Sequence, residues 1–320
     1  MTEQVRVMEA DEVGRLIGRV DALEVMQRLF AALGNGRATQ PPQTLARFPD
    51  GSGDFITYLG VLETARAFGA KLSPYINTAS GPLITAWTTL MSMDTGRPLL
   101  LVDSARLTVE RTAATSALAV RHLAPPRATR LAIIGTGPVA RAHLRQVRAM
   151  REWSEIRLHS RSLMRALDSH DELHGLDPRV MLCGSVDDAV QDADVVMLCT
   201  SSAEPVLDPA DLTTRALITS ISTNAPRAHE VPPLSLHLMD IYCDDRLTTP
   251  FSAGEMVLAA EYGWSPADDV CGDLGELVTG RAPTPSPDTH TFFRSIGLGL
   301  EDVAMAAALL ELAQRDATAS

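Results

Sequence analysis

The chain has 320 residues, with 28 basic and 40 acidic side chains and a formal net charge of −12 at pH 7. Domains average roughly 150 residues, so this length predicts about two of them, and the acidic balance disfavours nonspecific binding to nucleic acid or to an anionic membrane. The first residues form no apolar signal segment, and no stretch reaches the roughly 18 apolar residues of a membrane span. We therefore expect a cytoplasmic protein.

In the N-terminal third, apolar residues recur at helical spacing from about Asp21 to Leu33, which predicts a helix. The stretch from Pro41 to Gly53 predicts a loop. Apolar runs between Gly and Pro turns predict strands at Phe55–Tyr58, Ala70–Tyr75, Leu83–Met93 and Pro98–Val102. A helix capped by Asp103 or Ser104 then runs to about Leu123, and we expect it to carry the chain from one domain into the other.

After this helix, strands alternate with helices, a pattern typical of a parallel sheet with crossover helices. The candidate strands are Arg130–Gly135, Glu155–Ser160, Val180–Gly184, Val195–Thr200, Ala216–Ser222 and Met239–Cys243. A last helix from Leu300 to Gln314 is expected to return to the first domain. The predicted fold class is α/β: a Rossmann doubly wound parallel sheet plus a smaller α+β domain.

The first strand of this second pattern runs directly into a G-x-G-x-x-A motif and a helix, the context that dinucleotide binding requires. The first glycine permits a tight turn, the second lets backbone approach a pyrophosphate, and the helix N-terminus offers N–H groups to the anion. The expected cofactor contacts here are Gly135, Thr136, Gly137, Pro138, Val139 and Ala140.

The end of the second strand indicates which dinucleotide is preferred. Ser160, Arg161 and Ser162 stand where an NAD enzyme places a carboxylate on the ribose 2′-hydroxyl. A guanidinium flanked by hydroxyls favours a 2′-phosphate, so we expect NADP(H), with NAD(H) as the alternative.

The cations are 27 arginines and one lysine, Lys71. An ammonium is a compact donor whose pKa moves readily on burial, so a site that transfers a proton would keep Lys where the composition otherwise favours Arg. Four separated cysteines, Cys183, Cys199, Cys243 and Cys271, form no Cys-x-x-Cys pair. They predict free thiols and no metal site.

Further motifs lie on both sides of the G-x-G-x-x-A loop. The segment before it, from Lys71 to Pro125, contains Gly96-Arg97-Pro98 and Arg111-Thr112-Ala113-Ala114. The segment after it contains Asn224-Ala225-Pro226, Glu230, Val278-Thr279-Gly280-Arg281, Ser295-Ile296-Gly297 and Glu301-Asp302. This combination resembles the ornithine cyclodeaminase/mu-crystallin family. The resemblance implies a homodimer whose substrate-binding and dimerisation domain, residues 1–112 rejoined by 300–320, is joined to an NADP-binding Rossmann domain, residues 113–299.

Carried over by position, the resemblance implies that Arg47, Lys71 and Arg111, with Thr112 beside them, bind the carboxylate of a small amino or imino acid. Two observations therefore point to Lys71 as a functional residue: it is the single lysine of the chain, and the resemblance places it in the site. Further cofactor contacts are expected at Thr200, Ser201, Ser222, Thr223, Ser295 and Gly297.

The type enzyme carries an aspartate where this chain has Asn224, and an amide cannot accept the proton of a substrate amine. We therefore expect a ketimine reductase, which reduces Δ1-pyrroline-2-carboxylate to L-proline or Δ1-piperideine-2-carboxylate to L-pipecolate with NADPH. Lys71, or a water that it polarises, is the candidate proton donor, and Asn224 would orient substrate or water.

Three alternatives remain open: an ornithine cyclodeaminase, an alanine or other amino-acid dehydrogenase, and a noncatalytic NADPH-dependent binding protein. The last is disfavoured because a binder of apolar ligands has no reason to keep three desolvated, unpaired cations. The residues do not select the ring size of the substrate or its pathway.

Overall fold

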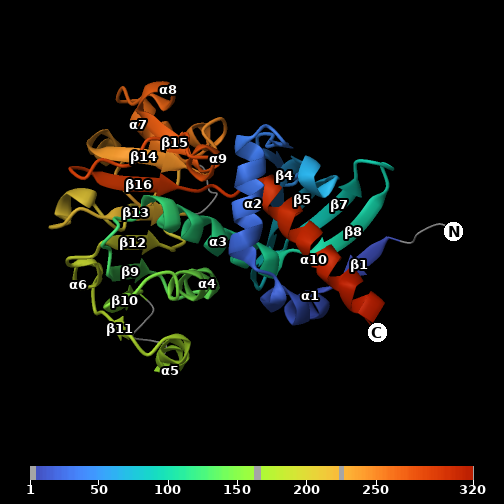
Figure 1. Ribbon diagram of the computed structural model, residues 1–320, viewed down its shortest axis with the longest axis horizontal. Helices are drawn as coiled ribbons and strands as arrows, with labels where there is room; N and C mark the ends of the chain where they lie inside the picture. Colours follow the sequence, from blue (N-terminus) through green and yellow to red (C-terminus); the bar gives the residue numbers. More distant parts are fainter. Residues whose placement is uncertain (1–4, 162–166, 223–226, 320) are drawn as a thin grey trace. The chain divides into compact units, whose positions relative to one another are not determined.

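The computed structural model describes residues 5–161, 167–222 and 227–319 (Figure 1). The chain divides into two compact units, the first comprising Met1–Arg111 with Gly297–Ser320 and the second comprising Thr112–Ile296. The helix α3 (Ala105–Leu123) contains the boundary between Arg111 and Thr112. Its start is capped as expected, because Asp103 Oδ1 accepts a hydrogen bond from the backbone N–H of Ala105 at 3.0 Å.

The first unit is built on a mixed sheet whose main path runs β1-β8-β7-β5-β4-β2, with β3 paired to β4 and β6 to β5. Its strands are β1 (Arg6–Met8), β2 (Ala38–Thr39), β3 (Thr44–Arg47), β4 (Gly53–Leu62), β5 (Ala67–Thr78), β6 (Gly81–Ile84), β7 (Trp87–Ser92) and β8 (Pro98–Asp103). Its helices are α1 (Ala10–Leu16), α2 (Ala22–Gly34) and α10 (Gly299–Ala319).

One face of this sheet is covered by α10, which packs on β4, β5 and β7 and also against α2. The start of α10 approaches β4 closely because both meeting residues are glycines. A Cβ on Gly60 would lie 2.8 Å from Leu300 Cα, and a Cβ on Gly299 would lie 2.3 Å from the carbonyl oxygen of Leu59. This approach fixes where the first turn of α10 lies over the sheet.

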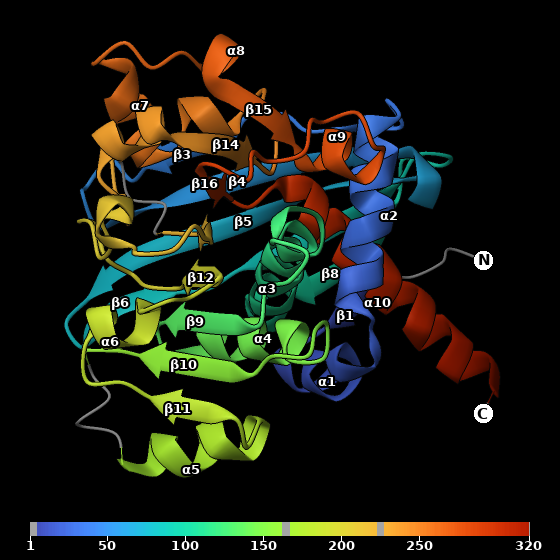
Figure 2. The same cartoon turned by 60° about the vertical axis from the view of Figure 1, so that its left-hand side comes forward.

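The second unit contains a parallel sheet with the strand order β11-β10-β9-β12-β13-β16-β14-β15. Figure 2 shows β9 between β10 and β12. The strands are β9 (Arg130–Ile134), β10 (Glu155–His159), β11 (Val180–Leu182), β12 (Val195–Leu198), β13 (Leu217–Ser220), β14 (Met239–Cys243), β15 (Val270–Asp273) and β16 (His290–Arg294). The α-helices are α4 (Pro138–Val147), α5 (Leu167–Leu176), α6 (Val186–Val190), α7 (Gly254–Ala260), α8 (Pro266–Asp269) and α9 (Leu274–Val278).

This order reverses direction beside β9, as in doubly wound nucleotide-binding sheets, so the predicted Rossmann fold is confirmed. Several local predictions were wrong. The run Leu83–Met93 is two strands, β6 and β7, and the predicted loop Pro41–Gly53 contains β3. The strands β15 and β16 were not predicted; they are short, and their sheet partners lie far away along the chain.

None of the described helices combines the length and the apolarity needed to cross a bilayer. All four cysteines are free thiols. Within the described ranges, no three His, Cys, Asp or Glu side chains gather in a way that could hold a metal ion.

Candidate functional site

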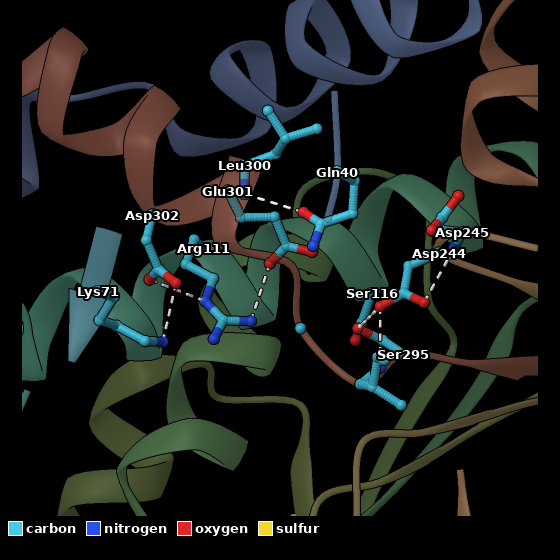
Figure 3. A network of polar contacts seen from close by, with 12 residues as sticks. Gln40, Lys71, Arg111, Ser116, Asp244, Asp245, Ser295, Leu300, Glu301 and Asp302 are labelled. Carbon is cyan, nitrogen blue, oxygen red and sulfur yellow. Dashed lines mark hydrogen bonds and ion pairs between the residues drawn. The ribbon is translucent and has the colours of Figure 1, made fainter. Parts of the chain in front are cut away.

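A buried ionic cluster in the first unit brings together two of the three predicted cations (Figure 3). Lys71 Nζ lies 2.8 Å from Asp302 Oδ2 and 4.2 Å from the centre of the Tyr58 ring. Arg111 Nη1 donates to Glu301 Oε2 at 2.9 Å, and its Nε lies 3.4 Å from Asp302 Oδ1. All four charged side chains are almost completely removed from solvent.

Three elements supply the members of this ionic cluster: Lys71 lies on β5, Arg111 lies on α3, and Glu301 and Asp302 lie on α10. Lys71 lies on β5 directly opposite Tyr58 on β4, so both side chains project from the same face of the sheet. Glu301 and Asp302 lie in the first turn of α10, where the helix dipole favours negative charge. The close contact between α10 and β4 therefore puts a carboxylate beside the lysine.

Burial controls the charge state of the cluster. Desolvation lowers the pKa of the Lys71 ammonium from 10.5 to about 8, although the Asp302 carboxylate favours the charged form. Burial also opposes the charge on Arg111, but Asp302 and Glu301 outweigh it and raise the pKa of the guanidinium above its ordinary value. Lys71 is therefore still charged at neutral pH, but its pKa lies much closer to neutrality than that of an ordinary lysine.

The structure corrects the expectation that the three cations are unpaired. Lys71 and Arg111 have carboxylate partners, so the argument drawn from unpaired charge against a pure binding protein no longer stands. Arg47 is exposed at the end of β3 rather than on a loop, opposite Asp54 on β4. No ion pair in the described part of the chain joins Arg47 to the cluster.

The backbone of Gly297 lies against the Arg111 guanidinium, a position that the sequence did not predict. Gly297, expected among the cofactor contacts, has φ of 75°, and a Cβ there would lie 2.2 Å from Arg111 Nη1. Only glycine fits both the backbone conformation and the space. The carbonyl oxygen of Gly297 accepts a hydrogen bond from Gln43 Nε2 at 2.9 Å. Gln43 carries no charge, and the sequence gave no signal that would have selected it.

The second unit contains the glycine-rich loop between β9 and α4. Gly135 has φ of 131°, and a Cβ there would lie 2.5 Å from the carbonyl oxygen of Cys199. Gly137 is the N-cap of α4 with no side-chain cap, and a Cβ added to it would meet nothing within 4 Å. The uncapped N–H groups of α4 and the open space beside Gly137 fit a bound pyrophosphate.

Neighbouring contacts hold this loop in shape. Arg141 Nε donates to the carbonyl oxygen of Thr136 at 3.0 Å, and Ala140 is buried where α4 packs on the sheet. Pro138 is the first residue of α4 and Val139 follows it, and the Val139 carbonyl oxygen pairs with His143 Nδ1 at 2.8 Å.

The structure places the predicted 2′-phosphate residues at the end of β10. Ser160 is half-buried and Arg161 is exposed, immediately after His159 at the end of the strand. Ser162 lies outside the described residues. An exposed guanidinium at this strand end is available to a phosphate from solvent.

The remaining predicted contacts follow the later strands. Thr200 and Ser201 come after β12, and Ser222 comes after β13 with φ of 35°. Thr223 and Asn224 lie outside the described residues. Ser295 is buried after β16, where its hydroxyl donates to Asp244 Oδ2 at 2.8 Å.

Residues 3–316 match the model of the ornithine cyclodeaminase/mu-crystallin family. The chain belongs to this family. It is 56% identical over 310 residues to the NAD(P)H-dependent anabolic L-arginine dehydrogenase DauB of Pseudomonas aeruginosa, covering 96% of this chain and 97% of the relative. It is 28% identical over 311 residues to the ketimine reductase mu-crystallin of Macropus fuliginosus, covering 93% and 94% of the two chains.

Among solved structures, the Δ1-pyrroline-2-carboxylate reductase of Thermococcus litoralis, in complex with NADH and L-proline, superposes with a TM-score of 0.88. The match covers 98% of each chain at 23% sequence identity, so it supports the fold. The prediction of the family is confirmed, and the name of the Pseudomonas aeruginosa relative agrees with the prediction of a nicotinamide-dependent enzyme.

Proposed function

We propose that this protein uses NADPH to reduce the imine of a 2-oxo acid, and that the physiological product is L-arginine. The chain is an NAD(P)H-dependent oxidoreductase of its family. The observation that carries the substrate proposal is the 56% identity, over nearly the whole of both chains, to an L-arginine dehydrogenase. The buried pair of Lys71 and Arg111 supplies the chemistry that such a reaction needs.

Arg111 is the proposed ligand of the substrate carboxylate. A guanidinium has five N–H donors in a fixed planar fork, and Glu301 and Asp302 engage only Nη1 and Nε. The two carboxylates thereby fix the orientation of the fork, and Gly297 keeps the space against its Nη atoms free of a side chain. An oriented fork binds a carboxylate in one geometry.

Lys71 is the proposed proton donor. With a pKa of about 8 the ammonium is charged at neutral pH and can still release a proton, as a general acid requires. A Lys71 N–H bond breaks as the imine nitrogen gains its proton, and Asp302 stabilises the ammonium before transfer. When bound, NADPH would supply the hydride for the imine carbon.

The G-x-G-x-x-A loop would hold the pyrophosphate of the cofactor, and Arg161 would hold a 2′-phosphate. Both the open N-terminus of α4 and the exposed guanidinium after β10 support these roles. We therefore propose a preference for NADPH over NADH.

A guanidinium side chain on the substrate requires an acceptor, and Asp54 is the proposed one. Tyr58, Lys71, Asp54 and Tyr75 share one face of the sheet, and this face changes from buried at Lys71 to exposed at Tyr75. Asp54 lies four residues from Tyr58 on β4, about 13 Å along the strand. The side chain of the bound arginine would span part of the distance between Lys71 and Asp54. The side chains of Lys71 and Asp54 would span the rest.

Cyclic imino acids are the second candidate substrates. The name of the mu-crystallin relative and the expectation at Asn224 both support reduction of a ketimine such as Δ1-pyrroline-2-carboxylate. A cyclic imine needs the same carboxylate ligand and the same proton donor but no acceptor for a side-chain cation. Asp54 therefore separates the two substrate classes.

We also propose a homodimer formed through the sheet of the first unit. Val7, Leu59 and Leu72 lie on three strands of this sheet, are exposed, and point away from the face that α10 covers. Apolar side chains gathered on one face favour burial against another surface. A second copy of the chain offers a matching apolar face. In light scattering, the wild-type protein should have the mass of a dimer and Leu72→Glu the mass of a monomer.

The test of function is NADPH oxidation with three substrate sets: the 2-oxo acid of arginine plus ammonium, Δ1-pyrroline-2-carboxylate, and L-ornithine with NAD as the cyclodeaminase control. We expect the first set to give the highest kcat/KM. Asp54→Asn should lower kcat/KM for the arginine precursor about tenfold or more, the contribution of a hydrogen bond between charged groups. Asp54→Asn should leave kcat/KM for the cyclic imine unchanged. Asp50→Asn, in the adjacent turn, is the matched control and should change neither value. A higher kcat/KM for the cyclic imine would overturn the arginine proposal.

A further inference from the structure

Glu230 is a fully buried carboxylate that joins the ends of two strands in the second unit. Its Oε1 accepts hydrogen bonds from the backbone N–H and the hydroxyl of Thr200, at 2.9 and 2.7 Å. Its Oε2 accepts from the hydroxyl of Ser220 at 2.7 Å and from the backbone N–H of Ser222 at 2.9 Å. One side chain thus receives two donors from the end of β12 and two from the end of β13.

The backbone around Glu230 extends the same connection. Its carbonyl oxygen accepts from the N–H of Val206 at 2.8 Å and of Leu207 at 3.3 Å, so the segment after Thr200 is held at two further points. The residue before it, His229, donates its backbone N–H to the carbonyl oxygen of Ala203 at 3.4 Å. Hydrogen bonds to Glu230 and to its neighbour His229 therefore hold the segment after β12 in place.

The held positions matter because of where they lie in the sheet. Parallel doubly wound sheets bind a dinucleotide outside the carboxyl ends of their strands, with its two halves on either side of the reversal in strand order. The strands β10 and β11 lie on one side of β9, and β12 and β13 lie on the other. The adenosine half belongs with β10, which places the nicotinamide half with the ends of β12 and β13.

The Ser222 backbone shows that the network holds an unfavourable conformation. Its φ of 35° is one that residues other than glycine rarely adopt, and its N–H is fixed by Glu230. The Ser222 hydroxyl is buried and has no hydrogen-bond partner among the described residues. A hydroxyl held in this way is available to a polar group of a ligand at the strand ends.

We infer that Glu230 is a positioning residue that sets the nicotinamide side of the cofactor site by holding Thr200 and Ser222 in fixed places. A carboxylate matches this task because it has only acceptors, and all four neighbours are donors. Glutamine in its place turns one oxygen into an NH₂ group that faces two donors. The inference rests on the proposed binding of NADPH at these strand ends, but it does not depend on the amino acid formed.

The experiment compares two ligands of the Glu230→Gln protein: NADPH, and 2′-phospho-ADP-ribose, which lacks the nicotinamide ring. We expect the Kd of NADPH to rise about tenfold or more, which is the effect of losing one hydrogen bond to a charged group. The Kd of 2′-phospho-ADP-ribose should stay within about twofold of wild type. A purely structural role would weaken both ligands equally or neither, and either result would overturn the inference.

Two further variants complete the design. Asp194→Ala is the matched control, because Asp194 Oδ2 accepts from the backbone N–H groups of Thr129 and Arg130 at the amino end of β9, away from the carboxyl ends of the strands. It should lower thermal stability without separating the two ligands. Ser220→Ala removes one donor to Glu230 at a residue that is not an expected cofactor contact, and it decides the question if Glu230→Gln fails to fold, since equal effects on both ligands would again overturn the inference. Failure of the wild-type protein to bind NADPH would instead refute the proposed function.

Discussion

Replacing Lys71 by methionine tests the central chemical proposal, because it removes the charge and keeps a side chain of similar length. The substitution leaves Asp302 fully buried with one remaining cation, Arg111, whose Nε lies 3.4 Å away. Removing one partner of a buried ion pair costs about 3–5 kcal/mol, since it leaves the other charge uncompensated. The free energy of unfolding of the first unit should fall by this amount in denaturant titrations.

The loss of activity has a separate cause. A positioned general acid contributes about 10²–10⁴-fold to the rate, so kcat of Lys71→Met should fall by this factor for every imine substrate. Lys71→Arg keeps a positive charge beside Asp302 but does not release a proton near neutral pH. It should retain more of the stability and still lose the rate.

The two effects are separated by the double variant Lys71→Met with Asp302→Asn. Removing both charges eliminates the uncompensated carboxylate, so most of the lost stability should return while kcat stays low. The assay is NADPH oxidation at saturating substrate, with the folded fraction measured by NADPH binding. A kcat of Lys71→Met within a few-fold of wild type, or recovery of kcat in the double variant, would refute the role of Lys71 as proton donor.

Three other predictions concern the ionic cluster and the proposed cofactor site. Because the pKa of Lys71 is lowered from 10.5 to about 8 on folding, the unfolded chain binds this proton more tightly. The difference in unfolding free energy between wild type and Lys71→Met should therefore rise by about 3 kcal/mol from pH 8 to 10.5, at about 1.4 kcal/mol per pH unit, and a flat difference would contradict the shift. Gly297→Ala brings a Cβ to 2.2 Å from Arg111 Nη1 and should raise the KM for the imino acid but not for NADPH; Gly36→Ala, at φ of 71° with open space around it, is the control for backbone strain alone. Arg161→Asp should shift the ratio of kcat/KM towards NADH by at least about tenfold, the value of one charge-assisted hydrogen bond, and unchanged selectivity would show that the phosphate is bound elsewhere.

The cofactor loop was predictable because its function depends on residues adjacent in the chain. Six consecutive residues from Gly135 to Ala140 contain the tight turn, the open backbone and the helix start, and the structure shows the corresponding φ value and the uncapped helix. The strands β15 and β16 were not predictable in the same way. Each has four or five residues, and β16 lies between β13 and β14 in the sheet, so its environment depends on segments distant in sequence.

The ionic cluster was only half predictable. Lys71 stood out as the single lysine and Arg111 through a family motif, but Glu301 and Asp302 look like ordinary acidic residues in the first turn of a helix. The contact between Arg111 and Glu301 spans 190 residues of chain. Arg47 was grouped with the cluster by resemblance alone, whereas Gly297, assigned to the cofactor, packs against Arg111.

The sequence by itself determined the alternation of strands and helices, the dinucleotide loop and the identity of the unusual lysine, because these features depend on local spacing and residue chemistry. The tertiary structure alone decided the charge state of that lysine. Its pKa depends on burial and on a carboxylate 2.8 Å away that belongs to the last helix, and this neighbour is brought close by a glycine contact between α10 and β4. Electrostatic energies depend on distance in space and on exclusion of water, and neither quantity can be read from the local order of residues before the chain is folded.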